Sequence, residues 1–276
     1  MAQTVLRILV SDPSEMNFVL MNCLESRKLV DRILVVEHDY SHSGRPLRSN
    51  FLALESEIRR LSGNTSVEVH FLSIEKEVIK NAISSEEMHF NEKLIRKSFL
   101  KECNISTEDL IYAVDADEVI YRKFFRLVKF LRKVLPKTDV SVSLMMHQFF
   151  YKMNYLWKEV RFRSPVLVSA NLAMKDADLL RDSGSLLPFW VGCHFSWQLT
   201  VQQMINKLQN YAHSPEYLHL ANEEVLKDAI ENRKYPFDTE RPFTIRILNE
   251  RSSHHFLPKS FFLMRNRFAK ESWGNP

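Results

Sequence analysis

The sequence contains very little glycine, with five residues in 276 against an average usage of about 7%. A dinucleotide-binding fingerprint or a phosphate-cradling P-loop needs glycines clustered at one turn between a strand and a helix. The glycines here form no such cluster, since they stand at Gly44, Gly63, Gly184, Gly192 and Gly274. If the chain binds a nucleotide phosphate, groups other than a glycine-rich loop must hold its charge.

Cysteine and long apolar runs are also scarce. Cys23, Cys103 and Cys193 form neither a CxxC pair nor a zinc-binding spacing, and an odd, sparse count is typical of buried thiols in a reducing compartment. No apolar run approaches the roughly eighteen residues of a membrane span, and the chain starts in a strand-like segment rather than a charged-then-apolar leader. We therefore expect a cytoplasmic protein without a transmembrane segment.

The charges are nearly balanced, with 38 basic and 34 acidic residues and a net charge of +4. This balance excludes wrapping by nucleic acid but allows a mild preference for anionic ligands. The C-terminal stretch from Lys259 to Lys270 combines cations with aromatic and aliphatic side chains. It fits either a helix docked on the sheet with a solvated basic face, which we favour, or a peripheral membrane contact.

Short apolar runs alternate with longer amphipathic stretches through the first 150 residues. Asp12, Pro13 and Glu15 form a helix start directly after the first run, because Asp caps, Pro fits the first turn and Glu favours its N-terminus. Buried strands separated by helices are what a mainly parallel sheet with both faces covered requires. We predict strands over 5–10, 33–36, 67–72 and 110–114, and helices from Asp12, over 52–61 and over 86–101.

The second half is less regular but shows no linker, repeat or low-complexity tract. We therefore predict one continuous α/β domain over residues 1–276, with a mixed, mostly parallel sheet flanked by helices. The patterns predict strands over 140–151, 166–174 and 189–197, and helices over 201–211, 222–232 and 260–270.

An acidic cluster, Asp115-Ala116-Asp117-Glu118, follows the predicted strand 110–114. Alternate residues of an extended chain share a face, so Asp115 and Asp117 can direct both carboxylates toward one cation. Hard oxygen ligands suit Mg²⁺ or Mn²⁺ acting on a diphosphate, and ligands of open α/β sheets collect at the carboxyl ends of strands. The alternative is a loop residue followed by the acidic first turn of a helix.

Several segments together resemble one known family. In chain order, these segments are Val30–Glu37 with Ser43-Gly44-Arg45-Pro46, Arg96 on a helix, Val114–Glu118 and Gly192–Trp197. In kind and order they are similar to motifs of the β-1,4-mannosyl-glycoprotein N-acetylglucosaminyltransferases. Further downstream, the resemblance continues with Lys207, Tyr211-Ala212-His213 and Glu216. The matched segments span residues 30–216, which is most of the chain.

The resemblance implies a GT-A-type fold and an inverting transfer of a sugar, GlcNAc in characterised members, from UDP to a carbohydrate acceptor. A glycan or a glycolipid is the expected acceptor, and residues 1–120 would form the nucleotide-sugar half and 121–276 the acceptor half. The resemblance also implies a divalent metal, Mn²⁺ or Mg²⁺, held by Asp115 and Asp117. His194 could complete the metal shell, since neutral imidazole is compatible with Mn²⁺. Cys193 stands where the family usually has Trp, which bears on local packing and acceptor choice.

The remaining candidate residues are charged. Glu37, Arg45, Arg96 and Asp115 are the candidates for binding the donor, Glu37 and Asp115 at its nucleoside and the arginines at its diphosphate. An inverting transfer needs a general base for the acceptor hydroxyl, and the candidates for it are Asp182 and Glu216.

Two other functions stay open at this point. The same acidic cluster could serve a metal-dependent nucleotidyltransferase or phosphoesterase, although the Gly-Ser pair that usually precedes such a cluster in nucleotidyltransferases is absent here. A degenerate transferase scaffold that binds sugar without turnover is the non-catalytic alternative.

Overall fold

The computed structural model describes residues 2–134, 139–209, 214–238, 240–268 and 273–274. Its centre is one sheet in which the strands follow the order β10-β7-β6-β8-β4-β1-β2-β3. The parallel block of this sheet consists of β1 (Thr4–Leu9), β2 (Arg32–His38), β3 (Val67–Leu72) and β4 (Leu110–Asp115). These four strands match the four predicted in the first half of the sequence to within three residues at each end.

The rest of the sheet mixes directions. Strand β8 pairs antiparallel with β4 and β6, and β6 pairs antiparallel with β7 and parallel with β9. The short β5 pairs antiparallel with β9. The α/β architecture with a mixed sheet is thus confirmed, and it is consistent with a GT-A-type fold. The bounds are β5 Glu118–Ile120, β6 Ser141–Phe150, β7 Tyr155–Phe162, β8 Val166–Ser169, β9 Leu186–Ser196 and β10 Ile245–Ile247.

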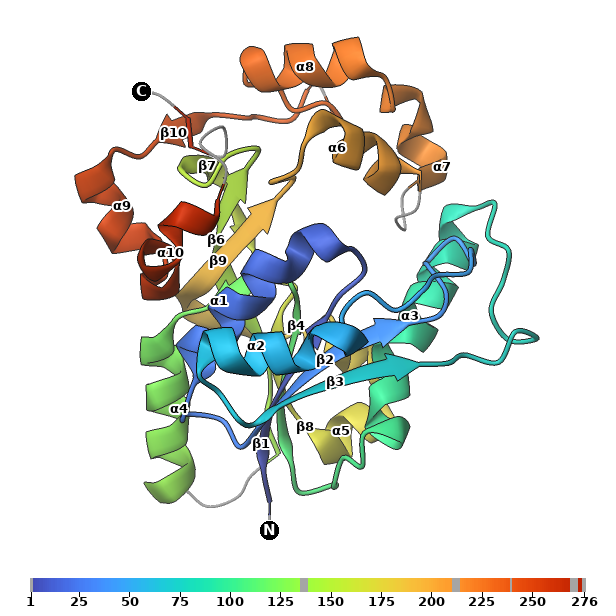
Figure 1. Ribbon diagram of the computed structural model, residues 1–276, viewed down its shortest axis with the longest axis vertical. Helices are drawn as coiled ribbons and strands as arrows, with labels where there is room; N and C mark the ends of the chain where they lie inside the picture. The colour runs from blue at the N-terminus through green and yellow to red at the C-terminus, as the bar shows by residue number, and fades with distance from the viewer. Residues whose placement is uncertain (1, 135–138, 210–213, 239, 269–272, 275–276) are drawn as a thin grey trace.

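Helices cover both faces of the sheet (Figure 1). Side chains of α1, α2, α4 and α10 share one apolar cluster with Leu6 and Ile8 of β1, whereas α3 and α5 pack in a second cluster with Val5. The bounds are α1 Met16–Ser26, α2 Glu55–Ser62, α3 Ser85–Glu102, α4 Arg122–Val134, α5 Ala170–Lys175, α6 Val201–Leu208, α7 Ser214–Tyr217, α8 Glu223–Glu231, α9 Glu250–Phe256 and α10 Lys259–Leu263. None of the helices in these described ranges combines the length and apolar character that crossing a membrane requires.

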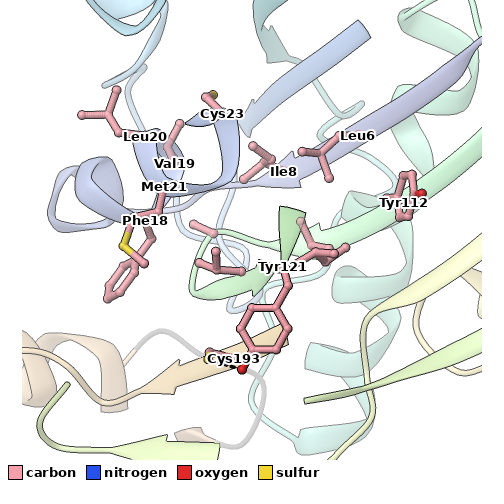
Figure 2. Packing of buried hydrophobic residues seen from close by; sticks show 14 of the residues in the cluster. Leu6, Ile8, Phe18, Val19, Leu20, Met21, Cys23, Tyr112, Tyr121 and Cys193 are labelled. Atoms are coloured by element: carbon pink, nitrogen blue, oxygen red, sulfur yellow. Dashed lines mark hydrogen bonds between the residues drawn. The ribbon is translucent and has the colours of Figure 1, made fainter. Parts of the chain in front are cut away.

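The turn between β1 and α1 is built as predicted. Asp12 accepts a hydrogen bond from the backbone of Ser14, and Glu15 reaches back to the cap in a capping box. The 3₁₀ turn Pro13–Glu15 then leads into α1. Figure 2 shows Phe18 to Met21 of α1 beside Leu6 and Ile8 of β1, in the core that fixes this turn against the sheet.

Cys193 lies in the same core, on β9. Its thiol donates to the backbone oxygen of Phe256 at 3.0 Å, and the Tyr121 hydroxyl lies 3.3 Å from its sulfur (Figure 2). Cys23, Cys103 and Cys193 are all free and buried, as the sparse count predicted. Burial raises the pKa of each of these thiols.

Two predicted elements are wrong in part. The strand predicted over 166–174 ends at Ser169, and Ala170–Lys175 is the helix α5, because Ala, Leu and Met favour a helix once the β-branched run has ended. The helix predicted over 260–270 is two short pieces, α10 and the 3₁₀ turn Arg265–Arg267. Residues 269–272 lie outside the described ranges.

Candidate active site

A cleft of about 460 Å³ opens at the carboxyl ends of β1, β2 and β4, where open α/β sheets collect their ligands. The segments after these strands meet the end of β9 and helix α6 there. Its charged and aromatic lining consists of Asp12, Glu15, His38, Tyr40, His42, Glu92, Arg96, Asp115, Asp117, Arg181, His194, Trp197 and Lys207.

Asp115, the last residue of β4, is surrounded by arginines. Arg96 binds it with two parallel hydrogen bonds, from Nη1 to Oδ1 at 2.6 Å and from Nη2 to Oδ2 at 2.8 Å. Arg181 adds a bond to Oδ2 at 3.2 Å, and Nη1 of the fully buried Arg7 lies 3.9 Å from Oδ1. Bidentate guanidinium–carboxylate pairs are among the strongest charged hydrogen bonds in proteins. Both oxygens of Asp115 are therefore already engaged by cations of the chain.

Glu92 and Glu118 complete this ionic network. Glu92 accepts from Arg96 Nε at 2.9 Å, one helical turn before it on α3. Glu118 is buried on β5 and accepts from Arg181 at 2.8 Å and from the backbone nitrogen of Asp115 at 2.8 Å. An acidic cluster after a buried strand would be costly without partners, and these arginines supply them.

The network shifts the pKa values of its members in opposite directions. Burial alone would raise the pKa of Asp115, but Arg96 and Arg181 outweigh it and hold that pKa well below its usual range. Burial, together with the neighbouring charge of Asp115, raises the pKa of Glu118. Asp115 therefore carries a firm negative charge at neutral pH, and it serves as the anchor of the arginines.

Asp117 has different partners, on the other side of the cleft. Its Oδ2 lies 3.5 Å from Nε2 of His194, because β5 and β9 pair across Glu118 and His194. Nδ1 of His194 lies 2.8 Å from Oε1 of Gln148, an oxygen that can only accept, so Nδ1 carries a hydrogen. In the neutral ring Nε2 then presents a lone pair toward the carboxylate of Asp117. A lone pair facing a carboxylate is a place for a proton or a metal cation.

The ring of His194 is held firmly in this orientation. It stacks on Phe162 of β7 with ring centroids 3.7 Å apart, and the neighbouring Cys193 side chain points into the core. Lys207 of α6 places its Nζ 4.0 Å from Asp117 and 5.5 Å from the centre of the Trp197 ring. Although burial raises the pKa of Asp117, the protonated form of His194 and the Lys207 ammonium lower it overall.

Glu15 lines the same cleft from the turn after β1. Its carboxylate accepts hydrogen bonds from the backbone nitrogens of Ser11 and Asp12, at 2.7 and 3.2 Å. Burial raises its pKa to about 7, and the negative charge of Asp117 contributes to the rise. Glu15 can thus exchange a proton near neutral pH.

The charge of the cleft is negative overall. Among its described lining residues, five carboxyl groups face three permanent cations, and protonation of Glu15 would remove one negative charge. The cations are Arg96, Arg181 and Lys207. A diphosphate would therefore meet a surface that repels it, unless a divalent cation entered with it.

Two predicted donor-binding residues lie away from the cleft lining. Glu37 is buried and accepts three hydrogen bonds, from the Ser49 hydroxyl and from the backbone nitrogens of Asn50 and Phe51. Glu37 thereby ties the segment after β2 to the sheet. Arg45 is exposed in that segment and pairs through its backbone with Ser41. Their contact with a donor stays a prediction.

The predicted base candidates are both exposed and are not among the residues that line the cleft. Asp182 accepts from the backbone nitrogen of Gly184, and Glu216 accepts from the Ser85 hydroxyl at 2.6 Å. The predicted segment Tyr211-Ala212-His213 lies outside the described residues. A catalytic role for Asp182 or Glu216 also stays a prediction.

Sequence reasoning missed Arg7, Arg181 and Gln148 as parts of the site. Arg7 had a readable signal, because a cation in the middle of the apolar run Val5–Val10 must find a buried carboxylate. Arg181 and Gln148 had none, since nothing in their local sequence indicates that they reach the acidic cluster or His194.

A search of curated proteins finds no match to this chain. The model of glycosyltransferase family 17 matches residues 3–237, a range that contains every residue of the cleft described above. The chain belongs to glycosyltransferase family 17.

Proposed function

We propose that this glycosyltransferase moves GlcNAc from UDP to a carbohydrate acceptor, with inversion and with a divalent metal bound at Asp117 and His194. Family membership supports the reaction class, and the resemblance of the motifs supports the donor. The observation that carries the metal site is the pairing of Asp117 Oδ2 with the lone-pair side of His194 in a cleft of negative charge.

The residues at hand fit a metal that is completed by the donor. The described residues contain no group of three His, Cys, Asp or Glu side chains placed to hold a metal ion. Mg²⁺ and its relatives are usually held by one or two protein ligands together with substrate phosphates and water, and Asp117 with His194 supplies such a pair. When bound, the cation would neutralise the leaving diphosphate.

The chain's own cations would divide the remaining work. Arg181 is about a third exposed, which leaves it room to meet a phosphate while it stays paired with Asp115 and Glu118. Lys207 can meet a second phosphate oxygen, because its Nζ stands 4.0 Å from Asp117 at the proposed metal site. Arg96 is buried between Glu92 and Asp115, so it would orient the network rather than bind the donor directly.

Inversion needs a carboxylate that takes the proton of the acceptor hydroxyl. Asp182 and Glu216 remain the candidates from the sequence, and Glu15 is added by its position in the cleft. A pKa near 7 suits a group that must give up and regain a proton at neutral pH. Acceptor binding would bring the hydroxyl to whichever of the three is the base.

The experiment measures release of UDP from UDP-GlcNAc, with and without acceptor mixtures, in Mn²⁺, Mg²⁺ or EDTA. We expect turnover that EDTA abolishes and that Asp117→Asn reduces at least 100-fold, a loss typical of removing one charged group at a transition state. Asp228→Asn on the exposed face of α8 is the matched control and should keep full activity. Among Glu15→Gln, Asp182→Asn and Glu216→Gln, the base is the variant whose pH–rate profile loses its acidic limb.

Turnover that survives both EDTA and Asp117→Asn would overturn the metal role. Saturable binding of UDP-GlcNAc without turnover on any acceptor would instead assign the chain as a sugar-binding protein on a transferase scaffold. Nucleotide release from donors without transfer of the sugar would revive the phosphoesterase alternative.

A further inference from the structure

Helix α4 carries an unusual combination of side chains away from the cleft. Its thirteen residues, Arg122–Val134, include six Lys or Arg residues and no acidic residue. Its buried side chains are Phe124, Phe125 and Val128, which fasten the helix to the core. In Figure 1 the helix lies at the outer edge of the molecule, on the side remote from α6 and α7.

Large apolar side chains stay exposed on the rest of this helix. Phe130 is 60% exposed and Val134 57%, and Leu127 and Leu131 are also exposed. Leu186 and Phe189 at the start of β9 are exposed as well, and the ring of Phe189 packs edge-on against Phe124 of α4. We call these six side chains and the exposed cations Lys123, Arg126, Lys129 and Lys133 the α4 patch.

The patch borders an apolar groove of about 740 Å³ between α4, β8 and the start of β9. Six of the fourteen large exposed apolar side chains among the described residues are gathered here. Scattered exposed apolar residues need no explanation, but a contiguous patch marks a contact with a partner or a membrane. The carboxylates that line the groove, Glu108, Asp109 and Asp139, all lie outside α4, so the positive charge is concentrated on the helix itself.

The helical spacing separates the two kinds of side chain. Leu127, Leu131 and Val134 recur at intervals of three and four and form an apolar stripe. Arg126 and Lys133 lie seven residues apart, about two helical turns, and form a neighbouring basic stripe, with Phe130 between the two stripes. Within the described residues, Lys123, Arg126 and Lys133 have no carboxylate partner in a salt bridge or side-chain hydrogen bond. An amphipathic helix with aromatic and Leu side chains beside unneutralised cations is the arrangement that lies in the surface of an anionic bilayer.

We propose that the α4 patch docks this protein on a membrane surface that contains anionic lipids. The cations of α4 would meet lipid phosphates and carboxylates, while Phe130 and its apolar neighbours would enter the boundary between head groups and acyl chains. The occupant is identified by charge complementarity, because the four exposed cations of the patch, on a helix without acidic residues, favour an anionic surface. The proposal does not depend on the donor, the metal or the base, since none of the patch residues lines the cleft.

The test is sedimentation of the full chain with two kinds of vesicle, one of phosphatidylcholine alone and one that also contains about 30% phosphatidylglycerol. The anionic lipid gives the second kind a negative surface potential like that of a cytoplasmic membrane leaflet. We expect binding to the anionic vesicles only, and loss of most of it at high salt. A Lys or Arg near such a surface strengthens binding about fivefold, so the triple change Lys123→Gln, Arg126→Gln, Lys133→Gln should weaken it about 100-fold. Phe130→Glu should weaken it about tenfold or more.

The matched controls change equal charge elsewhere on the surface. Lys76→Gln, Lys97→Gln, Lys101→Gln removes three exposed cations from the region of α3, and Ile83→Glu puts a carboxylate on an apolar residue that is 86% exposed. Both controls should bind vesicles nearly as the wild type does. All variants should keep the circular dichroism spectrum of the wild type, because every altered side chain is exposed.

Three results would overturn the proposal. The first is no binding to the anionic vesicles, and the second is binding that the control triple variant weakens as much as the α4 triple variant. The third is self-association, measured by analytical ultracentrifugation, that Phe130→Glu abolishes, since this would assign the patch to a second copy of the chain.

Discussion

Replacing Asp115 by Asn tests the ionic network behind the cleft. The side chain keeps its shape, but the counter-ion of Arg96, Arg181 and Arg7 is lost. The new amide group would also direct N–H donors at guanidinium donors. Removing one partner of a buried ion pair costs about 3–5 kcal/mol. The side chain of Asp115 is 24% exposed, so we expect a loss near the lower end, about 3 kcal/mol.

The free energy of unfolding is measured by urea denaturation, followed by circular dichroism. A loss of this size lowers the melting temperature by roughly 5 °C in a chain of this length. Glu223→Gln is the control, because it removes an ion pair with Lys227 on the exposed face of α8, and such exposed pairs contribute little to stability. A change of less than about 1 kcal/mol in the Asp115→Asn variant would refute the account of the network.

The difference between wild type and Asp115→Asn should also depend on pH. The pKa of Asp115 is held well below its usual range in the folded chain, so its contribution is present above the ordinary carboxyl pKa of about 3.9. That contribution is lost as the pH falls through the folded-state pKa. The two unfolding free energies should therefore converge in strong acid and stay apart from pH 5 upward.

Three further outcomes are expected. Glu15→Gln should gain stability relative to the wild type as the pH rises from about 4.5 to 7. The pKa of Glu15 is raised in the folded chain, so the wild type loses stability through that range. Thermal melts of both proteins at pH 5 and pH 8 measure the difference in stability, and an equal difference at both pH values would contradict it. Gly192→Ala should destabilise the chain by about 1–3 kcal/mol, since its Cβ would lie 2.4 Å from the Val119 backbone oxygen; the urea midpoint relative to the wild type measures this loss, and an unchanged midpoint would contradict it. Lys207→Gln should raise KM for UDP-GlcNAc about tenfold with a smaller change in kcat, and unchanged donor kinetics would remove Lys207 from the donor site.

The first half of the fold was predictable from local sequence. Strands β1, β2 and β4 are short aliphatic runs buried on both faces, and the edge strand β3 alternates buried and half-buried residues over most of its length. Residues Asp12 to Glu15 carry the chemistry of a helix start. The acidic cluster could be placed at the carboxyl end of a strand for the same reason. Helix α4 was not predicted, although its period is readable in the sequence, because Phe124, Val128 and Leu131 recur at intervals of four and three between the cations.

The site was predictable in its carboxylates but not in their partners. Asp115 and Asp117 do line one cleft, yet Asp115 binds arginines and Asp117 faces His194. Local spacing shows which side chains share a strand, but Arg181 is brought to Asp115 only by the long-range pairing of the sheet. Glu37 shows another limit of local sequence, since its place at the end of a strand did not reveal that its carboxylate accepts three hydrogen bonds from the chain.

The central claim is a metal-dependent transfer at Asp117 and His194. The most direct measurement is a titration of UDP-GlcNAc turnover with Mn²⁺ for the wild type, Asp117→Asn and His194→Gln, each on the same acceptor mixture. The account predicts no turnover in the wild type without metal, saturation as Mn²⁺ is added, and a much higher Mn²⁺ requirement in both variants. Equal turnover at every Mn²⁺ concentration, or variants with the metal requirement of the wild type, would contradict it.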